Sequence, residues 1–161
     1  MTIRLLPPVP GTMDTFRTTP LFESMGEPEL RRIASFARLV PASDGDIVLR
    51  EGERADALFL IERGLVRLEH QAMAAFGPVQ LLGEGDAFGL SAVVEPHVHV
   101  TTAVAVSDAM LWRIPANELR QLLVADPQLR ADVLNGACRL LRDRYAAALA
   151  GANYWMGRRT A

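Results

Sequence analysis

Residues 85–106, GDAFGLSAVVEPHVHVTTAVAV, contain the groups of this chain that are best suited to chemistry. The backbone N–H groups of residues 89–92 could form a small anion-binding nest. His97 and His99 are two residues apart, so on a strand they would face the same side and could ligate a metal or haem. No further cysteine or histidine lies nearby to complete a metal site, so two solvated loop histidines are the favoured interpretation.

Ser91, His99 and Asp108 are the residues from which a hydrolytic triad could be assembled. Nothing in their spacing supports a triad, and the chain has no nucleophile elbow. The sequence therefore predicts a protein that is not an enzyme, and it gives no reason to expect a cofactor.

The composition limits the class of protein. The chain has 161 residues, of which 50% are hydrophobic and 22% charged, so one domain with a core is expected rather than disorder. No apolar run approaches the ~20 residues of a membrane span. A formal charge of −2 provides no broad basic surface, so we expect no direct binding of nucleic acid and no membrane partner. Cys138 is the single cysteine, which indicates a reducing, cytoplasmic setting.

The elements around residues 85–106 follow from turn signals and periodicity. Residues 1–20 contain four prolines and are predicted to be an irregular arm that includes one helical turn. From Glu27 an apolar helical period predicts a helix that Pro41 ends. Between residues 40 and 114, short runs of Val, Ile and Leu are separated by glycines, which is typical of an all-β sandwich or barrel.

Turn residues define the strands within this β region. Residues 57–69 predict a hairpin whose turn through residues 62–64 uses the positive φ of Gly64. Gly45-Asp46 and Gly85-Asp86 are a repeated signal, each before a strand.

The helical period returns after residue 114. Pro115 suits the start of a short helix, Asp126 is a plausible N-cap, and Pro127 suits the first position of a longer last helix. A heptad seam on that helix predicts a homodimer contact. Its candidate residues are Leu134, Cys138, Leu141, Tyr145, Ala148 and Ala152.

A second apolar stripe on the last helix, Leu129, Val133, Ala137 and Leu140, is expected to pack on the chain's own β region. The alternative is one wide stripe that faces the core. Cys138 is expected to be a buried, inert thiol. Tyr154 and Trp155 are expected at the dimer interface, with folding back toward the β region as the alternative.

This pattern resembles the cyclic-nucleotide-binding domain of catabolite-activator regulators, protein kinase A regulatory subunits and gated channels. The matching residues are Gly45-Asp46, Gly52-Glu53, Asp56, Leu58-Phe59-Leu60-Ile61, Gly64 and the segment LLGEGDAFG. The resemblance covers about residues 21–144. It implies a mainly β fold with flanking helices: an eight-stranded β-roll with an N-terminal helix and two C-terminal helices, the last one long. The roll with its helices is expected over residues 21–126, and the long helix with its tail over residues 127–161.

The chain departs from the family at its phosphate-binding cassette. The family has a Glu that accepts the ribose 2′-hydroxyl and an Arg that pairs with the cyclic phosphate. Leu90 stands at the position of the Glu, and His99 stands at the position of the Arg. A charge-assisted hydrogen bond contributes about 1.5–3 kcal/mol, so losing both costs about 3–6 kcal/mol, or two to four decades in Kd. We therefore expect no tight binding of cyclic AMP or cyclic GMP.

The candidate ligand-binding residues are those of the degenerate cassette. They are Phe88, Gly89, Leu90, Ser91, Ala92, His99, Val100, Thr101 and Thr102. Leu90 is expected to fill the core, with an apolar ligand pocket as the alternative. Arg67 and Arg113 are expected to be surface charges rather than relocated phosphate partners.

The resemblance implies a regulatory sensor module, dimeric through its last helix. In bacterial regulators that helix leads into a winged helix-turn-helix domain, and none is expected in these 161 residues, so the chain either acts through partner proteins or is part of a longer regulator. One alternative is a different ligand, such as a cyclic dinucleotide, haem or another small molecule. Another is a protein-interaction module with a vestigial pocket. A cupin-like metalloenzyme on His97 and His99 is disfavoured, because no Glu follows closely and no later histidine exists.

Overall fold

The chain folds into a β-roll with helices at one end. The computed structural model describes residues 13–76 and 80–158, with side chains described for 13–75 and 80–150. Its eight strands form two antiparallel four-stranded sheets. The predicted roll, its N-terminal helix and its two C-terminal helices are confirmed.

The two sheets interleave distant parts of the sequence. The first has the order β1 (Arg38–Ala42), β8 (Ala109–Pro115), β3 (Ala57–Arg63) and β6 (Ala87–Phe88). The second has the order β2 (Ile47–Leu49), β7 (Thr102–Ala105), β4 (Val66–Glu69) and β5 (Gln80–Leu82). The helical elements are α1 (Met13–Thr18), η1 (Pro20–Phe22), α2 (Glu27–Ala34), η2 (Gln71–Phe76), η3 (Leu90–Ala92), α3 (Ala116–Ala125) and α4 (Pro127–Arg158).

Strand β3 is buried on both faces and so divides the core. Because side chains alternate along a strand, Leu58 and Leu60 join the cluster beneath the helices. Phe59 and Ile61 join the cluster between the two sheets. This explains the unbroken apolar run of β3, which carries no polar alternation until Glu62.

The repeated Gly-Asp signal marks two equivalent turns. Gly45 and Gly85 have φ of 88° and 84°, which favours glycine in both places. The carboxylate that follows closes each turn: Asp46 accepts from the Ser43 amide at 2.8 Å, and Asp86 accepts from the Gly83 amide at 2.9 Å. Gly64 has the predicted positive φ, 100°, but the hairpin predicted over residues 57–69 is wrong. Strand β3 lies in the first sheet and β4 in the second, so the turn at Gly64 carries the chain from one sheet to the other.

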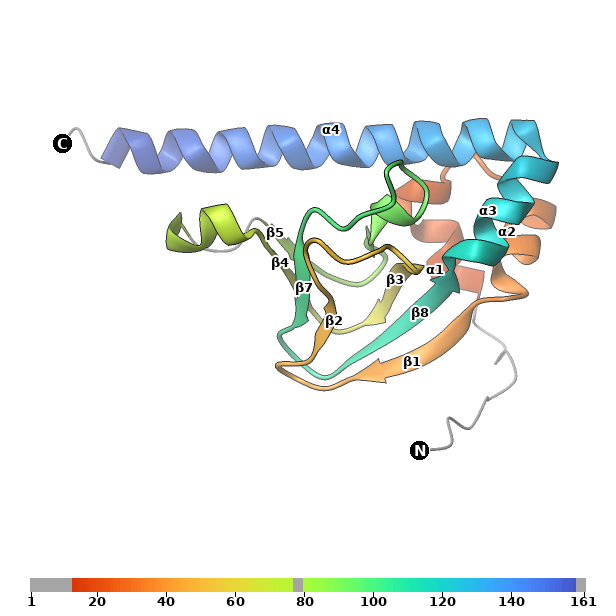
Figure 1. The fold of residues 1–161 in the computed structure, drawn as a ribbon, viewed down its shortest axis with the longest axis horizontal. Coiled ribbons are helices and arrows are strands. Elements are labelled where there is room, and N and C mark those ends of the chain that lie inside the picture. The colour runs from red at the N-terminus through yellow and green to blue at the C-terminus, as the bar shows by residue number, and fades with distance from the viewer. Residues whose placement is uncertain (1–12, 77–79, 159–161) are drawn as a thin grey trace.

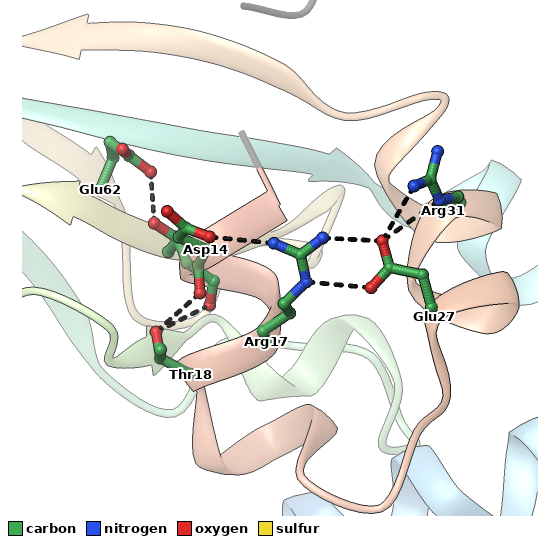
Figure 2. Close-up of polar contacts among 7 residues, drawn as sticks. Asp14, Arg17, Thr18, Glu27, Arg31 and Glu62 are labelled. Carbon is green, nitrogen blue, oxygen red and sulfur yellow. Dashed lines mark hydrogen bonds and ion pairs between the residues drawn. The ribbon is translucent and has the colours of Figure 1, made fainter. Parts of the chain in front are cut away.

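The described part of the predicted N-terminal arm is helical and packs into the core. Residues 1–12 lie outside the described residues, but α1 is a helix that buries Phe16 against Trp112. Figure 2 shows how it is held: Arg17 donates to both carboxylate oxygens of Glu27, at 2.9 and 2.7 Å, and to Asp14. The fully buried Phe16 side chain makes α1 part of the core, so tertiary packing outweighs the weak local signal of this short segment.

The prediction that Pro41 ends a helix is wrong. Helix α2 stops at Ala34, and Pro41 lies inside β1, opposite Met110 of β8. Strand β1 is at the edge of its sheet, where a residue without an N–H is tolerated.

Helix α4 lies along the roll and continues past it, as Figure 1 shows. Asp126 is its N-cap, as predicted, and accepts from the Leu129 amide at 3.0 Å. The predicted inner stripe is confirmed, because Leu129, Val133, Ala137 and Leu140 are all buried against the chain's own core. Within the described part of the chain, no helix has the length and apolarity to cross a membrane.

Candidate ligand-binding site

The cassette turn is set by Gly89. Its φ of 76° is left-handed, and a Cβ there would lie 3.0 Å from the carbonyl oxygen of Ala57. Only glycine combines that conformation with so close a strand. Immediately after it, the chain makes the one-turn helix η3, whose closing hydrogen bond runs from the Ala92 amide to the Gly89 carbonyl at 2.9 Å.

Leu90 and His99 are both buried at this turn, 6% and 5% exposed. Leu90 belongs to the core beneath the helices, as predicted, and it also lines a cavity. His99 is held by its backbone: its amide donates to the Glu53 carbonyl at 2.9 Å, and its carbonyl accepts from the Gly52 amide at 2.8 Å.

The prediction of two solvated histidines is wrong. Besides the burial of His99, His97 is half-buried, has φ of 60°, and its Nδ1 lies 2.9 Å from the Ser91 carbonyl oxygen. The loop folds back onto η3, which buries His99 and partly covers His97. Among residues 13–76 and 80–158, no group of three or more His, Cys, Asp or Glu side chains is placed to hold a metal ion.

A cavity of about 270 Å³ lies between the cassette and α4. The cassette contributes Gly89, Leu90, Ser91, His99, Val100 and Thr101 to its lining. Helix α4 contributes Leu141, Arg144, Tyr145 and Ala148, and the roll adds Leu49, Leu68 and Gln80.

Three predicted site residues lie outside this lining. Phe88 is buried and stacks on Phe59, with ring centroids 5.1 Å apart. Ala92 is fully buried in the core. The Thr102 hydroxyl accepts from the Glu51 amide at 3.0 Å and faces a different cavity.

Arg144 is the cavity residue that the sequence analysis missed. Its Nη2 donates to the carbonyl oxygen of Ala87, in β6 just before the cassette turn. The position continues the inner stripe of α4, four residues after Leu140. An arginine on the buried side of the helix was therefore the sequence signal that could have identified Arg144 as a site residue.

Burial lowers the pKa of both basic side chains in the cavity, His99 and Arg144. It lowers the pKa of His99 below its ordinary 6.5, against the opposing carboxylates of Asp56 and Glu53. His99 is thus a neutral imidazole near pH 7. Burial also lowers the pKa of Arg144, against the opposing carboxylate of Asp86, but a guanidinium stays charged in proteins.

The predicted dimer seam falls into two parts. Leu134 is half-buried and Cys138 is exposed, so the expectation of a buried thiol is wrong for the isolated chain. Leu141, Tyr145 and Ala148 are exposed along one edge while they line the cavity. The side chains of Ala152, Tyr154 and Trp155 lie outside those described, so the expectations for them stay untested.

A second cavity, of about 650 Å³, lies beside Arg50, Glu51, Arg67, Glu69 and His70. Its charged groups largely pair with one another. Arg67 Nε donates to Glu69 at 2.5 Å, and His70 Nε2 lies 3.5 Å from Glu51. Arg113, the other strand arginine, pairs with Asp56 at 2.9 Å, so neither strand arginine reaches the cassette cavity.

Solved structures share this fold. A candidate cyclic nucleotide-binding protein from Geobacter metallireducens superposes with a TM-score of 0.74 at 21% identity, over 88% of this chain and 99% of that one. The catabolite activator protein of Thermus thermophilus gives a TM-score of 0.66 at 24% identity, over 86% of this chain and 63% of that one.

The chain is also similar in sequence to known proteins. An uncharacterised NTE family protein of Mycobacterium tuberculosis is 28% identical over 129 residues, which is 78% of this chain and 21% of the relative. The chain therefore spans about a fifth of that protein's length. The family model of the cyclic nucleotide-binding domain matches residues 39–126, from β1 through α3, which is more than half of the chain. The chain belongs to the cyclic nucleotide-binding domain family.

Proposed function

We propose that this domain is a regulatory sensor module whose signal is not cyclic AMP or cyclic GMP bound in the family's usual mode. The observation that carries the proposal is the pair of buried, uncharged side chains, Leu90 and His99, at the two positions where the family places its ionic anchors. In that mode, the ribose 2′-hydroxyl of a cyclic nucleotide would face the alkyl side chain of Leu90. Its phosphate would meet an imidazole that is neutral near pH 7.

We propose that the module signals ligand binding by a change in the position of α4 relative to the roll. The helix closes one side of the cassette cavity through Leu141, Arg144 and Tyr145, so a molecule in that cavity contacts the roll and the helix together. A ligand that binds one arrangement of roll and helix more tightly shifts the population toward it. We further propose that the exposed edge of α4 pairs with a second copy or with a partner protein. No catalytic role is assigned to the described residues.

The test is thermal denaturation of the purified protein with 0.1 mM cyclic AMP or cyclic GMP. If Kd were ~1 µM, this concentration would add about 2.7 kcal/mol to the free energy of unfolding, a rise of several degrees in Tm. We expect no rise. A clear rise for the wild type would contradict the proposal.

The matched gain-of-function variant is Leu90→Glu combined with His99→Arg, which restores both anchors. We expect cyclic nucleotide to raise the Tm of this variant and not that of the wild type. Circular dichroism at 20 °C checks that the variant is folded. His99→Arg alone serves if two buried charges unfold the roll, because His99 lines the cavity without belonging to either apolar core cluster, whereas Leu90 is part of the core.

A further inference from the structure

Arg144 places a positive charge at the cassette cavity without a carboxylate partner. Within the described part of the chain, its guanidinium donates to the backbone carbonyl of Ala87. Within the described residues it has no Asp or Glu oxygen within 4.0 Å, and the nearby Asp86 carboxylate is engaged by the Gly83 amide of its own turn. The Asp86 carboxylate is near enough to act on Arg144 through space but is not in ion-pair contact with it, so the partly buried cation is only partly compensated and can accept a further anion.

His99 is a second polar group that faces the same cavity. Its side chain is almost completely buried, and within the described residues its ring nitrogens make no recorded hydrogen bond. Neither ring nitrogen is among the fully buried, unpaired atoms of the described residues, so the imidazole opens onto the cavity. A neutral imidazole can offer one N–H donor and one acceptor to a molecule in the cavity.

The rest of the cavity wall is mostly apolar. Leu49, Leu68 and Leu90 come from the roll, and Leu141 and Tyr145 come from α4. At about 270 Å³ the space is slightly below the range of ~300–1,000 Å³ that is typical of ligand pockets. The wall therefore favours a ligand with a compact apolar body.

We propose that the cavity between the cassette and α4 binds a small organic carboxylate, with Arg144 as its counter-charge. Arg144 has five N–H groups and gives one to Ala87, so others remain for a carboxylate. His99 adds a neutral hydrogen bond, and the leucines contact the apolar body. The cation comes from the last helix rather than from a strand of the cassette. This inference rests on the proposed sensor role only in taking the cavity as the ligand site.

A purely structural Arg144 would behave differently. If its function were to tie α4 to Ala87, a neutral donor of similar reach would serve as well and would avoid the cost of burying a charge. Arg144→Gln keeps an amide donor and removes the charge. A ligand-binding Arg144 is therefore distinguished from a structural one by whether the cavity prefers charged ligands to neutral ones, and not by the stability of the variant.

The experiment measures Kd by calorimetry at pH 7.5 for acetate, butyrate and benzoate and for the neutral amides of the same three acids. Inorganic phosphate tests whether any anion suffices. The variants are Arg144→Gln, Arg144→Lys and the control Arg142→Gln. Arg142 is on the same helix, but it is exposed and pairs with Asp143 at 2.8 Å.

We expect at least one carboxylate to bind, and to bind more tightly than its amide. Arg144→Gln should raise its Kd about tenfold or more, Arg144→Lys should recover part of the loss, and Arg142→Gln should leave Kd unchanged. Equal affinity for acid and amide, equal loss in both Gln variants, or no carboxylate binding up to 10 mM would overturn the inference. Tighter binding of phosphate than of any carboxylate would overturn the ligand class. None of these outcomes depends on the cyclic nucleotide test, so the two proposals can fail separately.

Discussion

The burial of His99 makes the stability of the folded protein depend on pH. In the unfolded chain its pKa is near 6.5, and burial lowers it in the folded protein. Between these two values the unfolded state binds more protons than the folded state, so the free energy of unfolding falls as the pH falls. The contribution of His99 to stability is fully present above pH 6.5 and is lost as the pH falls toward its folded-state pKa.

We therefore expect the wild type to lose Tm between pH 7.5 and pH 5.5, and His99→Gln to lose less over the same interval. Differential scanning calorimetry at closely spaced pH values measures the slope. His97→Gln is the control, because His97 lies in the same loop but is more exposed. Parallel slopes for the wild type and His99→Gln would show that His99 is not the titrating group.

Sequence reasoning predicts part of the site and misses its cation. The cassette turn and the replacements at Leu90 and His99 follow from local pattern, because turn glycines and their spacing are encoded in neighbouring residues. Arg144 is 55 residues beyond Gly89, and its approach to Ala87 depends on how α4 lies across the roll. Nothing local to residues 140–148 specifies that angle.

Gly136 explains how α4 approaches the rest of the molecule so closely. A Cβ at this position would lie 2.0 Å from the carbonyl oxygen of Leu21 in η1. A glycine inside a helix normally costs up to ~1 kcal/mol relative to alanine. Here the missing side chain lets the helix touch the backbone of η1, and Leu21 is fully buried beneath it.

We expect Gly136→Ala to destabilise the protein by about 1–3 kcal/mol, although helix propensity alone favours alanine. Chemical denaturation followed by circular dichroism measures the change. Asn135→Ala, one residue earlier and exposed, is the control and should be neutral or slightly stabilising. A Gly136→Ala variant as stable as the wild type would mean that α4 and η1 are not in this close contact.

The elements themselves differ in how well the sequence predicts them. The strands, the positive φ of Gly64 and the start of α4 at Pro127 are set by local residues and are confirmed. The hairpin predicted at Gly64 is wrong, because tertiary contacts place β3 and β4 in different sheets. Helix α1 and the place of Pro41 are decided by tertiary contacts. Phe16 is helical because it packs on Trp112, and Pro41 is tolerated because β1 is an edge strand. Both depend on residues about 70 to 95 positions away.

At the scale of the whole molecule, the exposed edge of α4 is the surface for the proposed dimer. Leu141, Tyr145 and Leu149 of α4 are 44%, 67% and 48% exposed and follow one another at intervals of four residues. A row of large apolar side chains on one helix favours packing against a second helix.

We expect light scattering to give twice the mass of one chain, and Leu141→Asp to shift the population toward monomer. Val124→Asp is the control, because Val124 is 75% exposed on α3 and is not part of the α4 row. A monomeric wild type at 0.1 mM would contradict the dimer. The same measurement with Cys138→Ser excludes association through a disulfide between exposed thiols.

The close contact between Gly136 and the Leu21 backbone is a point about which α4 could rotate relative to the roll. At 1.5 Å per residue, Arg144 is about 12 Å along the helix from this contact, and Arg158 is about 33 Å from it. If the helix swings as a stiff rod with Gly136 as its pivot, every ångström of travel at Arg144 becomes nearly three at the far tip. A molecule small enough to fit beside one guanidinium would thereby be reported across the length of the protein.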